Sequence, residues 1–288
     1  MTGPALVRAA RPKQWIKNVL VAAGPLAGGW PNGWETTVAV ILAFVCFCLI
    51  ASAVYLVNDV IDRPEDRAHP VKRFRPIASG EVGPGLALGT AVVLAVASLL
   101  VAYAFGRPQL IVVLGSYAVI QLSYCLWLKY QAVLDLAAVA SGFLLRAIAG
   151  GVAAGVVLSQ WFLLVASFGS LFMVAGKRYS EVHLVGEHAA STRRSLEDYS
   201  ASYLRFTWGL AASATITFYC LWAFEVGGGN PLLAQLSIIP FVLALLRYAV
   251  DIDRGAAGEP ESIVAGDRVL ETLGLCWLLL FGASAVLA

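Results

Sequence analysis

The chain has 288 residues, of which 59% are hydrophobic and 13% are charged, and its formal net charge is +2. Because a soluble domain usually carries about 25% charged residues, this composition, together with a mean hydropathy of +0.78, excludes an ordinary soluble protein and indicates a protein of the lipid bilayer. The five cysteines all lie in apolar segments without metal-ligand spacing, and we interpret them as small packing residues.

Nine apolar stretches follow one another along the chain. A helix needs about 20 apolar residues to cross the hydrocarbon core of a bilayer, and this criterion predicts about nine transmembrane helices. They cover 16–31, 36–57, 85–105, 108–128, 132–156, 160–176, 203–224, 231–250 and 268–287. The sequence therefore predicts an all-α integral membrane protein in which residues 1–288 form a single transmembrane domain. Pro25 predicts a kink in the first span.

The basic residues lie almost entirely on one side of these spans. If the N-terminus is cytosolic, then the tail, the four loops on that side and the adjoining helix ends carry all of the 20 Lys and Arg residues except Arg107 and Arg146. This distribution obeys the positive-inside rule. We therefore expect a multi-pass protein of the cell (inner or plasma) membrane, with its N-terminus and a polar cap that holds the active site facing the cytosol.

The most concentrated run of charge, NDVIDRPEDRAHPVKRFRPIASG (58–80), begins at the inner end of the second span. If the helix continues for two turns beyond that span, Asn58, Asp62 and Asp66 share one face and Asp59 lies beside them. Hard oxygen ligands of this kind suit Mg²⁺, whose coordination is usually completed by waters and substrate phosphates. The run therefore predicts a magnesium site at the boundary between membrane and cytosol.

A cluster of bases follows these carboxylates, with Lys72, Arg73 and Arg75 close behind His69. Bases beside a carboxylate–metal site suit a substrate with several phosphate groups, because Arg and Lys bind the oxygens that the metal does not reach. The alternative is an ordinary charged inner loop. The positive-inside rule accounts for the bases in that case, but it does not account for the carboxylates.

The Asn/Asp part of the run resembles the NDxxDxxxD signature of the UbiA-type intramembrane prenyltransferases, and RFRPIASG (73–80) resembles the element that follows it. SYCLWLKY (123–130), at the end of the fourth span, is also similar, as is the number of spans. This resemblance covers the whole chain. It implies a helical bundle around a cavity that opens to the membrane, with carboxylates at its cytosolic mouth that hold a Mg²⁺ cofactor and a diphosphate.

One departure from that family concerns its second aspartate motif, DxxxD, at the end of the sixth span. The corresponding stretch here reads GKRYSEVHLVGE (176–187), with Lys177 and Glu181 at the same spacing and Arg178 and Tyr179 between them. A lysine in place of a carboxylate weakens a second metal site and adds an anion site. The stretch therefore favours a substrate with more phosphate groups than prenyl transfer to a neutral ring requires.

Three further stretches, RPKQWIKN (11–18), HPVKRFRPIASG (69–80) and LDLAAVASGFLLRAIAGG (134–151), resemble a phosphoribosyltransferase branch of the family. This resemblance implies transfer of the 5-phosphoribosyl group from phosphoribosyl diphosphate to a polyprenyl (decaprenyl) phosphate, with release of diphosphate. The reaction would be a Mg²⁺-dependent pentosyl transfer that supplies the lipid-linked arabinose donor of cell-wall arabinan. Donor and acceptor together carry three anionic groups, which would explain the excess of bases.

The candidate site residues divide into three groups, and their roles are hypotheses. The catalytic candidates are Asp59, Asp62 and Asp66. The candidate ligands of Mg²⁺ are Asn58, Asp62 and Asp66. The candidate substrate-binding residues are Lys17, Lys72, Arg73, Arg75, Lys177, Arg178, Tyr179 and Glu181. The bases would bind donor or acceptor phosphates, and the last two residues would contact ribose hydroxyls or a water on the metal.

Two other functions stay open at this point. Prenyl transfer to an aromatic or quinone precursor keeps the fold and changes the acceptor, and the missing second aspartate pair argues against it. A secondary transporter of an anionic solute would use Arg146 and the inner bases, but the sequence shows no internal repeat of the kind many transporters have. The expected partners are phosphoribosyl diphosphate, a polyprenyl phosphate lipid and the membrane, with no nucleic acid and with homo-oligomer formation left open.

Arg146 lies about 20 Å into the fifth span, a depth at which ionisable residues usually face the bundle interior. Asp135 is too far along the same face for a direct ion pair. We expect Arg146 to bind carbonyl oxygens in the bundle or to line the cavity. Small residues at four-residue spacing around it, including Gly142 and Gly151, predict close helix packing. His183 and His188 are expected to be solvated loop residues.

Overall fold

The computed structural model describes residues 4–31, 33–185, 198–226, 230–255 and 266–286, and every element in these ranges is a helix. The elements, with η denoting a 3₁₀ helix, are α1 (Ala5–Ala9), η1 (Pro12–Ala22), α2 (Ala23–Ala27), α3 (Gly33–Ile61), α4 (Arg63–Ala68), η2 (Lys72–Phe74), α5 (Pro76–Ser79), α6 (Pro84–Ala104), α7 (Pro108–Leu126), η3 (Leu128–Tyr130), α8 (Leu134–Ala154), α9 (Gln160–Val185), α10 (Ala201–Glu225), α11 (Pro231–Asp253) and α13 (Arg268–Val286). The prediction of an all-α fold is confirmed.

Six of the described helices are long and apolar enough to cross a membrane, namely α3, α6, α7, α8, α9 and α11. These six lie at predicted spans. Helices α10 and α13 also lie where spans were predicted, with lengths of 25 and 19 residues. A total of nine spans and the cytosolic position of the cap stay predictions.

The segment predicted as the first span differs from a continuous α-helix. Residues Pro12–Ala22 form the 3₁₀ helix η1, and only Ala23–Ala27 continue as α-helix. A 3₁₀ helix rises about 2.0 Å per residue, so this segment is thinner and more extended than an α-helix. It packs on α8 where that helix carries glycines: a Cβ at Gly150 would lie 1.6 Å from the Val21 carbonyl oxygen. The close packing predicted from the small residues of the fifth span, which is α8, is confirmed.

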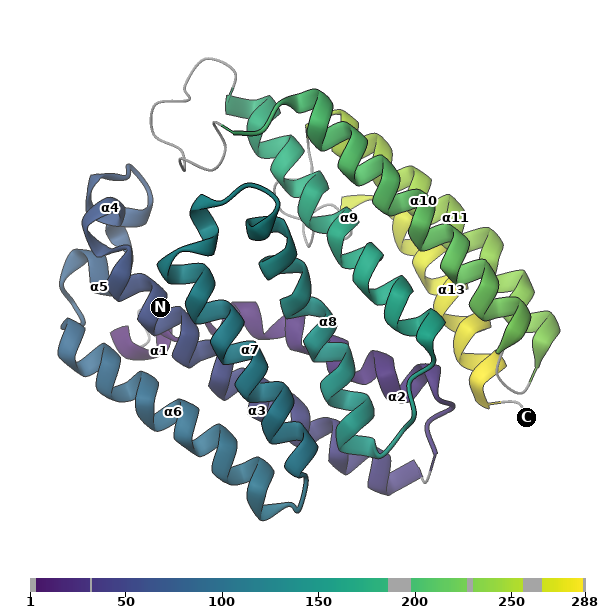
Figure 1. The fold of residues 1–288 in the computed structure, drawn as a ribbon, viewed down its shortest axis with the longest axis horizontal. Coiled ribbons are helices and arrows are strands. Elements are labelled where there is room, and N and C mark those ends of the chain that lie inside the picture. The colour runs from purple at the N-terminus through teal and green to yellow at the C-terminus, as the bar shows by residue number, and fades with distance from the viewer. Residues whose placement is uncertain (1–3, 32, 186–197, 227–229, 256–265, 287–288) are drawn as a thin grey trace.

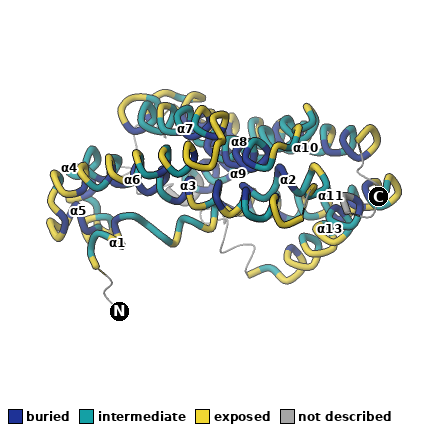
Figure 2. The backbone as a smooth tube through the Cα atoms, turned by 90° about the horizontal axis from the view of Figure 1, so that it is seen from below, coloured by how far each residue is buried: buried dark blue, intermediate teal, exposed yellow. Residues whose placement is uncertain are grey.

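Two helices occupy the interior of the bundle (Figures 1 and 2). Within their most apolar stretches, 61% of α3 and 56% of α8 is buried inside the protein, against 22–28% for α6, α7, α9 and α11. One hydrophobic core joins α3, α7 and the C-terminal half of α8, and a second joins the N-terminal half of α8 to α9, α10 and α11. The outer helices turn large apolar side chains outward, as a surface in contact with lipid requires.

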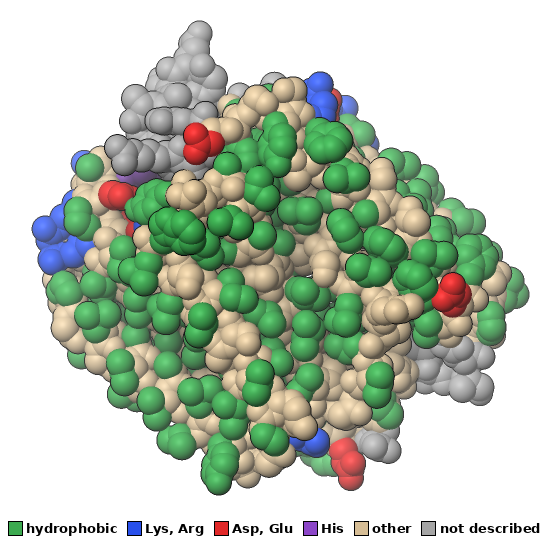
Figure 3. Space-filling model, viewed as in Figure 1, with side chains coloured by type: hydrophobic (Ala, Val, Ile, Leu, Met, Phe, Trp, Pro, Cys, Tyr) green, Lys and Arg blue, Asp and Glu red, His purple; other side chains and the backbone are tan. Residues whose placement is uncertain are grey.

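Charged side chains lie at the edge of the molecule. On the face seen in Figure 3, a broad field of hydrophobic and uncharged groups separates a charged upper-left and upper rim from a few charges on the lower and right rim. The short helices α4 and α5 lie at that upper-left end, between α3 and α6 (Figure 1). This arrangement puts the charged run 58–80 at one end of the apolar bundle.

Candidate functional site

The helix that carries the aspartates continues almost unbroken from α3 into α4. The amide of Asp62 donates to the Asn58 carbonyl and the amide of Asp66 to the Asp62 carbonyl, each at 2.8 Å. These are i to i−4 hydrogen bonds of an α-helix. Pro64 lies in the first turn of α4, a position that tolerates proline because its fixed φ suits the start of a helix. The predicted continuation of the helix is therefore confirmed.

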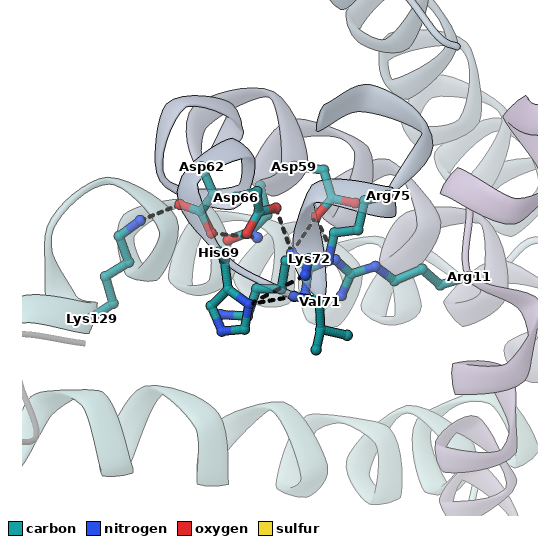
Figure 4. A network of polar contacts seen from close by, with 10 residues as sticks. Arg11, Asp59, Asp62, Asp66, His69, Val71, Lys72, Arg75 and Lys129 are labelled. Atoms are coloured by element: carbon teal, nitrogen blue, oxygen red, sulfur yellow. Dashed lines mark hydrogen bonds and ion pairs between the residues drawn. The ribbon is translucent and has the colours of Figure 1, made fainter. Parts of the chain in front are cut away.

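Each of the three aspartates contacts a cation (Figure 4). Asp59 Oδ1 accepts from the Arg11 guanidinium and, at 3.2 Å, from Arg75 Nη1. The same Arg75 nitrogen lies 2.7 Å from Asp66 Oδ2, so that Arg75 bridges two carboxylates. On the other side of the helix end, Asp62 Oδ1 lies 2.5 Å from Lys129 Nζ of η3.

The aspartates differ in how open they are. The side chains of Asp59 and Asp66 are 2% and 4% exposed, whereas that of Asp62 is 17% exposed. Burial of a carboxylate requires paired charge and hydrogen bonds, which Arg11 and Arg75 supply. Asp62 is therefore the aspartate that a ligand reaches most directly.

Lys129 is a buried partner of Asp62. Burial opposes its charged form, but the hydrogen bonds to Asp62 and Tyr130 outweigh that effect, and the pKa of Lys129 lies above its ordinary value. The lysine is thus charged at neutral pH and compensates Asp62. The ammonium group also lies 4.9 Å from the centre of the Tyr130 ring, which adds a cation–π contact.

The oxygen donors fit a hard cation in their chemistry. Asp62 and Asp66 lie one helical turn apart, and the side-chain amide of Asn58 donates to Asp62 Oδ2 at 2.9 Å, which leaves its own carbonyl oxygen for another partner. Within the described part of the chain, no three acidic, histidine or cysteine side chains converge on one point. A divalent cation would therefore share these carboxylates with Lys129 and Arg75, and substrate oxygens would complete its coordination.

The bases of the following loop point in different directions. Arg75 turns inward to the aspartates, whereas Arg73 is exposed and stacks on Phe74, with its guanidinium carbon 4.8 Å from the ring centre. The amide of Lys72 donates to His69 Nδ1 at 3.3 Å. Lys17 lies on η1, partly buried. Arg75 is thus a predicted base that contacts two of the aspartates, Asp59 and Asp66.

The residues predicted on α9 form a separate polar cluster. Arg178 is buried and donates to Asp135 Oδ2 at 3.3 Å and to Glu181 Oε2 at 2.6 Å. Tyr199 donates to Asp135 Oδ1 at 2.5 Å. Burial and this hydrogen bond raise the pKa of Tyr199 well above its ordinary value. Arg178 therefore ties α9 to the start of α8 and has its donors engaged inside the protein.

Tyr179 lies on another side of α9. Its side chain is 1% exposed, and its hydroxyl accepts from Arg205 of α10 at 2.7 Å. Lys177 is partly buried, and Glu181 keeps 30% of its side chain exposed. The structure thus does not bring Tyr179 to the aspartates. His188 lies outside the described residues, and so does the side chain of His183.

Two residues of the network were not assigned from the sequence. Arg11 lies in RPKQWIKN and Lys129 in SYCLWLKY, and both stretches were noted only for their resemblance. Their pairing joins residues 48 and 67 positions apart. Local periodicity carries no information on such contacts. The usable signal was the presence of basic residues at the end of each of these two predicted spans.

The fold and the site together define an all-helical membrane protein with a carboxylate and cation site at one end of its bundle. The model of the UbiA prenyltransferase family matches residues 19–286. The chain therefore belongs to the UbiA family.

Similar proteins support this assignment at two levels. A decaprenyl-phosphate phosphoribosyltransferase of Mycobacterium tuberculosis is 54% identical over 283 residues, covering 97% of this chain and 93% of that protein. One of Mycolicibacterium smegmatis is 52% identical over 292 residues, covering 97% and 92%. A solved structure of a UbiA homolog from Archaeoglobus fulgidus bound to GPP and Mg²⁺ has a TM-score of 0.71 at 16% identity, covering 99% of this chain and 100% of that chain. The last likeness shows the fold alone.

Proposed function

We propose that this chain transfers the 5-phosphoribosyl group of phosphoribosyl diphosphate to a polyprenyl phosphate such as decaprenyl phosphate, with release of diphosphate. The observation that carries the proposal is the alternation of carboxylates and cations at one end of an apolar bundle. The 54% identity to a protein named for this activity supports the choice of donor and acceptor. The product would serve as a precursor of the lipid-linked arabinose donor for cell-wall arabinan.

Asp62 and Asp66, with Asn58, would hold Mg²⁺, because they offer oxygen ligands on successive turns of one helix. When bound, the metal neutralises charge on the leaving diphosphate. Asp59 has a different environment, buried between two arginines. Its role in our proposal is to hold Arg75 in place beside Asp66.

The cations of the network are the groups that would bind the donor. Arg75 and Lys129 contact carboxylates through flexible side chains, and both can turn toward phosphate oxygens at the same end of the bundle. Lys17, Lys72 and Lys177 remain candidates for the donor's 5-phosphate and for the acceptor phosphate, and Glu181 for a ribose hydroxyl. The buried contacts of Arg178 and Tyr179 favour a supporting role for those two side chains.

Cleavage at the anomeric carbon develops positive charge on the sugar, as in glycosyl transfer generally. Carboxylates near the reacting carbon would stabilise that charge, while the bases hold the departing and attacking phosphates. The acceptor phosphate is already an anion near neutral pH. No strong general base is therefore required, and the proposal assigns none.

The reaction also fixes an expected location. The apolar helices indicate a multi-pass membrane protein, and we propose that the network faces the cytosol of the cell membrane, where a soluble sugar donor is available. The polyprenyl phosphate would reach the same site from the bilayer.

Replacement of Asp62 tests the proposal. Purified protein in lipid would be incubated with Mg²⁺, a polyprenyl phosphate and labelled phosphoribosyl diphosphate. We expect a lipid-linked label with the parent chain, and about a 10²- to 10³-fold lower kcat in Asp62→Ala because electrostatic stabilisation is lost. Glu65→Ala, which removes an exposed carboxylate of the same segment, is the matched control and should retain activity.

The same assay separates the rival reaction. A chain that labels no lipid phosphate but prenylates an aromatic acid would be a prenyltransferase, and the proposal would fail. Equal loss of activity in Asp62→Ala and Glu65→Ala would contradict the special role of Asp62.

A further inference from the structure

Arg146 is a buried arginine near the middle of α8, with 5% of its surface exposed. Its guanidinium donates from Nε to Asn18 Oδ1 at 2.7 Å, from Nη1 to the Gly142 carbonyl at 2.6 Å and from Nη2 to the Tyr117 hydroxyl at 3.3 Å. Each of the three nitrogens thus has a neutral oxygen as partner. The expected carbonyl contact is present, but it is only one of three.

No acidic side chain pairs with this arginine among the residues that the structure describes. Three aromatic rings surround the charge instead, with the guanidinium carbon 5.1 Å from the centre of Tyr117, 5.4 Å from Phe47 and 5.8 Å from Phe143. Cation–π contacts compensate a desolvated guanidinium in part. A cation kept at this depth without a counter-ion indicates a function for the residue.

The Asn18 contact connects Arg146 to η1. Asn18 is 1% exposed, and its amide nitrogen lies 3.2 Å from Cys48 Sγ of α3. Asn18 is therefore held between α3 and α8. In α2, which follows η1 directly, a Cβ at Gly24 would lie 2.6 Å from the Ala147 carbonyl oxygen. The chain from η1 into α2 therefore also follows the backbone of α8 closely.

Arg11 is the N-cap residue directly before η1, and its guanidinium pairs with the buried Asp59. Arg11 has φ 55° and ψ 57°, a left-handed conformation that residues other than glycine rarely adopt. Tertiary contacts must hold the segment for this conformation to persist. Arg146 of α8 donates a charged hydrogen bond to Asn18 of the segment. Trp15 of the segment donates from Nε1 to Ser52 Oγ of α3 at 3.0 Å, which adds a neutral contact.

We propose that Arg146 is a positioning residue, which fixes η1 through Asn18 and so sets Arg11 against Asp59 at the site. It does not touch substrate in this assignment. It acts on the donor-binding network through the N-terminal segment. The effect on catalysis rests on the proposed function, whereas the effect on η1 does not.

The experiment therefore measures both effects on Arg146→Met and Asn18→Leu in lipid. Methionine keeps the length of the side chain and places no charge in the bilayer, so the bundle should fold. Hydrogen exchange of the peptide covering Pro12–Ala22 should become about tenfold faster in both variants, because a hydrogen bond to a charged group is lost. The peptide covering Pro84–Ala104 of α6 is the internal control and should not change.

The kinetic readout separates positioning from simple support. We expect KM for phosphoribosyl diphosphate to rise about tenfold while kcat of the folded protein changes less than about threefold, since the lost contact acts on binding. The double variant should add little to either single one. Asn18→Asp keeps an oxygen that can accept from Arg146. It should leave hydrogen exchange of Pro12–Ala22 and KM close to the values of the parent chain.

Three outcomes would overturn the inference. They are unchanged exchange in Pro12–Ala22, faster exchange in α6 to the same extent, and faster exchange in η1 with an unaltered KM. If the parent chain has no phosphoribosyl transfer, the proposed function fails, and a selective exchange effect would still establish that Arg146 fixes η1.

Discussion

Three aspartates on one helix end have three different environments. Asp59 is enclosed by two arginines, Asp66 shares Arg75, and Asp62 faces Lys129 with part of its side chain open. The paired cations offset the repulsion between neighbouring carboxylates, and this explains how several carboxylates can stay close together at an apolar boundary. The same pairing means that a metal ion bound at these carboxylates, as we propose, would compete with a side-chain cation.

Lys129→Gln tests this competition. Removal of the ammonium group should free Asp62 and tighten binding of a divalent cation by about tenfold, the scale of one charged hydrogen bond. Titration with Mn²⁺ followed by electron paramagnetic resonance would measure the dissociation constant directly. Transfer activity should fall in the same variant, because Lys129 would no longer bind the donor.

The exposed Lys13 provides the matched control for the charge change. Lys13→Gln alters the net charge equally and should leave the Mn²⁺ constant within about twofold of the parent, since exposed charges are screened. Weaker Mn²⁺ binding in Lys129→Gln would show that Lys129 supports the cation site instead of competing with it.

The environment of His69 predicts that the local stability of its loop depends on pH. Its Nδ1 accepts from the amides of Val71 and Lys72 at 3.2 and 3.3 Å. Partial burial and the nearby charge of Lys72 lower the pKa of His69 from its ordinary value. The folded loop therefore favours the neutral imidazole over the charged one. Its contribution is fully present above about pH 6.5, the unfolded value, and is lost as pH falls through the lower folded pKa.

Protection of the Val71 and Lys72 amides from hydrogen exchange, corrected for the intrinsic rate, should thus decrease between pH 7.5 and pH 5. His69→Asn keeps an acceptor oxygen that does not titrate in this range, and it should remove the pH dependence. Amides that remain equally protected at pH 5 in the parent chain would contradict the assignment of Nδ1 as acceptor.

At the scale of elements, glycines decide how η1 packs. Gly150→Ala would place a methyl group against the Val21 carbonyl, and overpacking of this kind costs about 1–3 kcal/mol. Gly89→Ala on α6 meets no atom within 4 Å. It should leave stability unchanged or raise it by about 0.5–1 kcal/mol through helix propensity.

Unfolding free energies of both variants in mixed micelles would measure the difference. Gly150→Ala should also accelerate hydrogen exchange in η1, which is the effect expected from loss of the Arg146 contact. Equal stability of the two alanine variants would mean that η1 can shift away from α8 without cost.

The elements show which parts of the structure the sequence could predict. The long apolar helices and the helical continuation through Asp62 follow from local composition and the 3.6-residue period, and both are present. The 3₁₀ helix η1 was not predicted, because its conformation depends on glycines more than 120 positions away in α8. Arg11 and Lys129 were missed for the same reason, since only tertiary packing brings them to the aspartates.

The predicted roles on α9 illustrate a second limit. The spacing of Lys177 and Glu181 correctly placed them on one helix, but it could not show that Arg178 faces a buried Asp135. Composition indicates how much charge a loop carries. Partners on other helices decide whether that charge is available to a ligand.

At the scale of the whole molecule, the charged network and the α6–α7 turn lie at opposite ends of the apolar bundle (Figure 1). The positive-inside rule predicts that the more basic end faces the cytosol. Exposed positions are available at both ends, at Ala68 of α4 and Gln109 of α7. Cysteines at these two positions would therefore report which end faces which side.

A thiol reagent that cannot cross membranes should label Ala68→Cys only in inverted vesicles and Gln109→Cys in intact cells. The described native cysteines lie within helices, and the parent chain measures their background. Labelling of Ala68→Cys from outside the cell would show that the orientation is opposite to the predicted one. The donor site would then face away from the cytosolic pool of sugar phosphates, and a supply of phosphoribosyl diphosphate would have to be found on the outer side before the proposed transfer could occur. Orientation thus tests the function independently of any site residue, because the reaction depends on which compartment holds its soluble substrate.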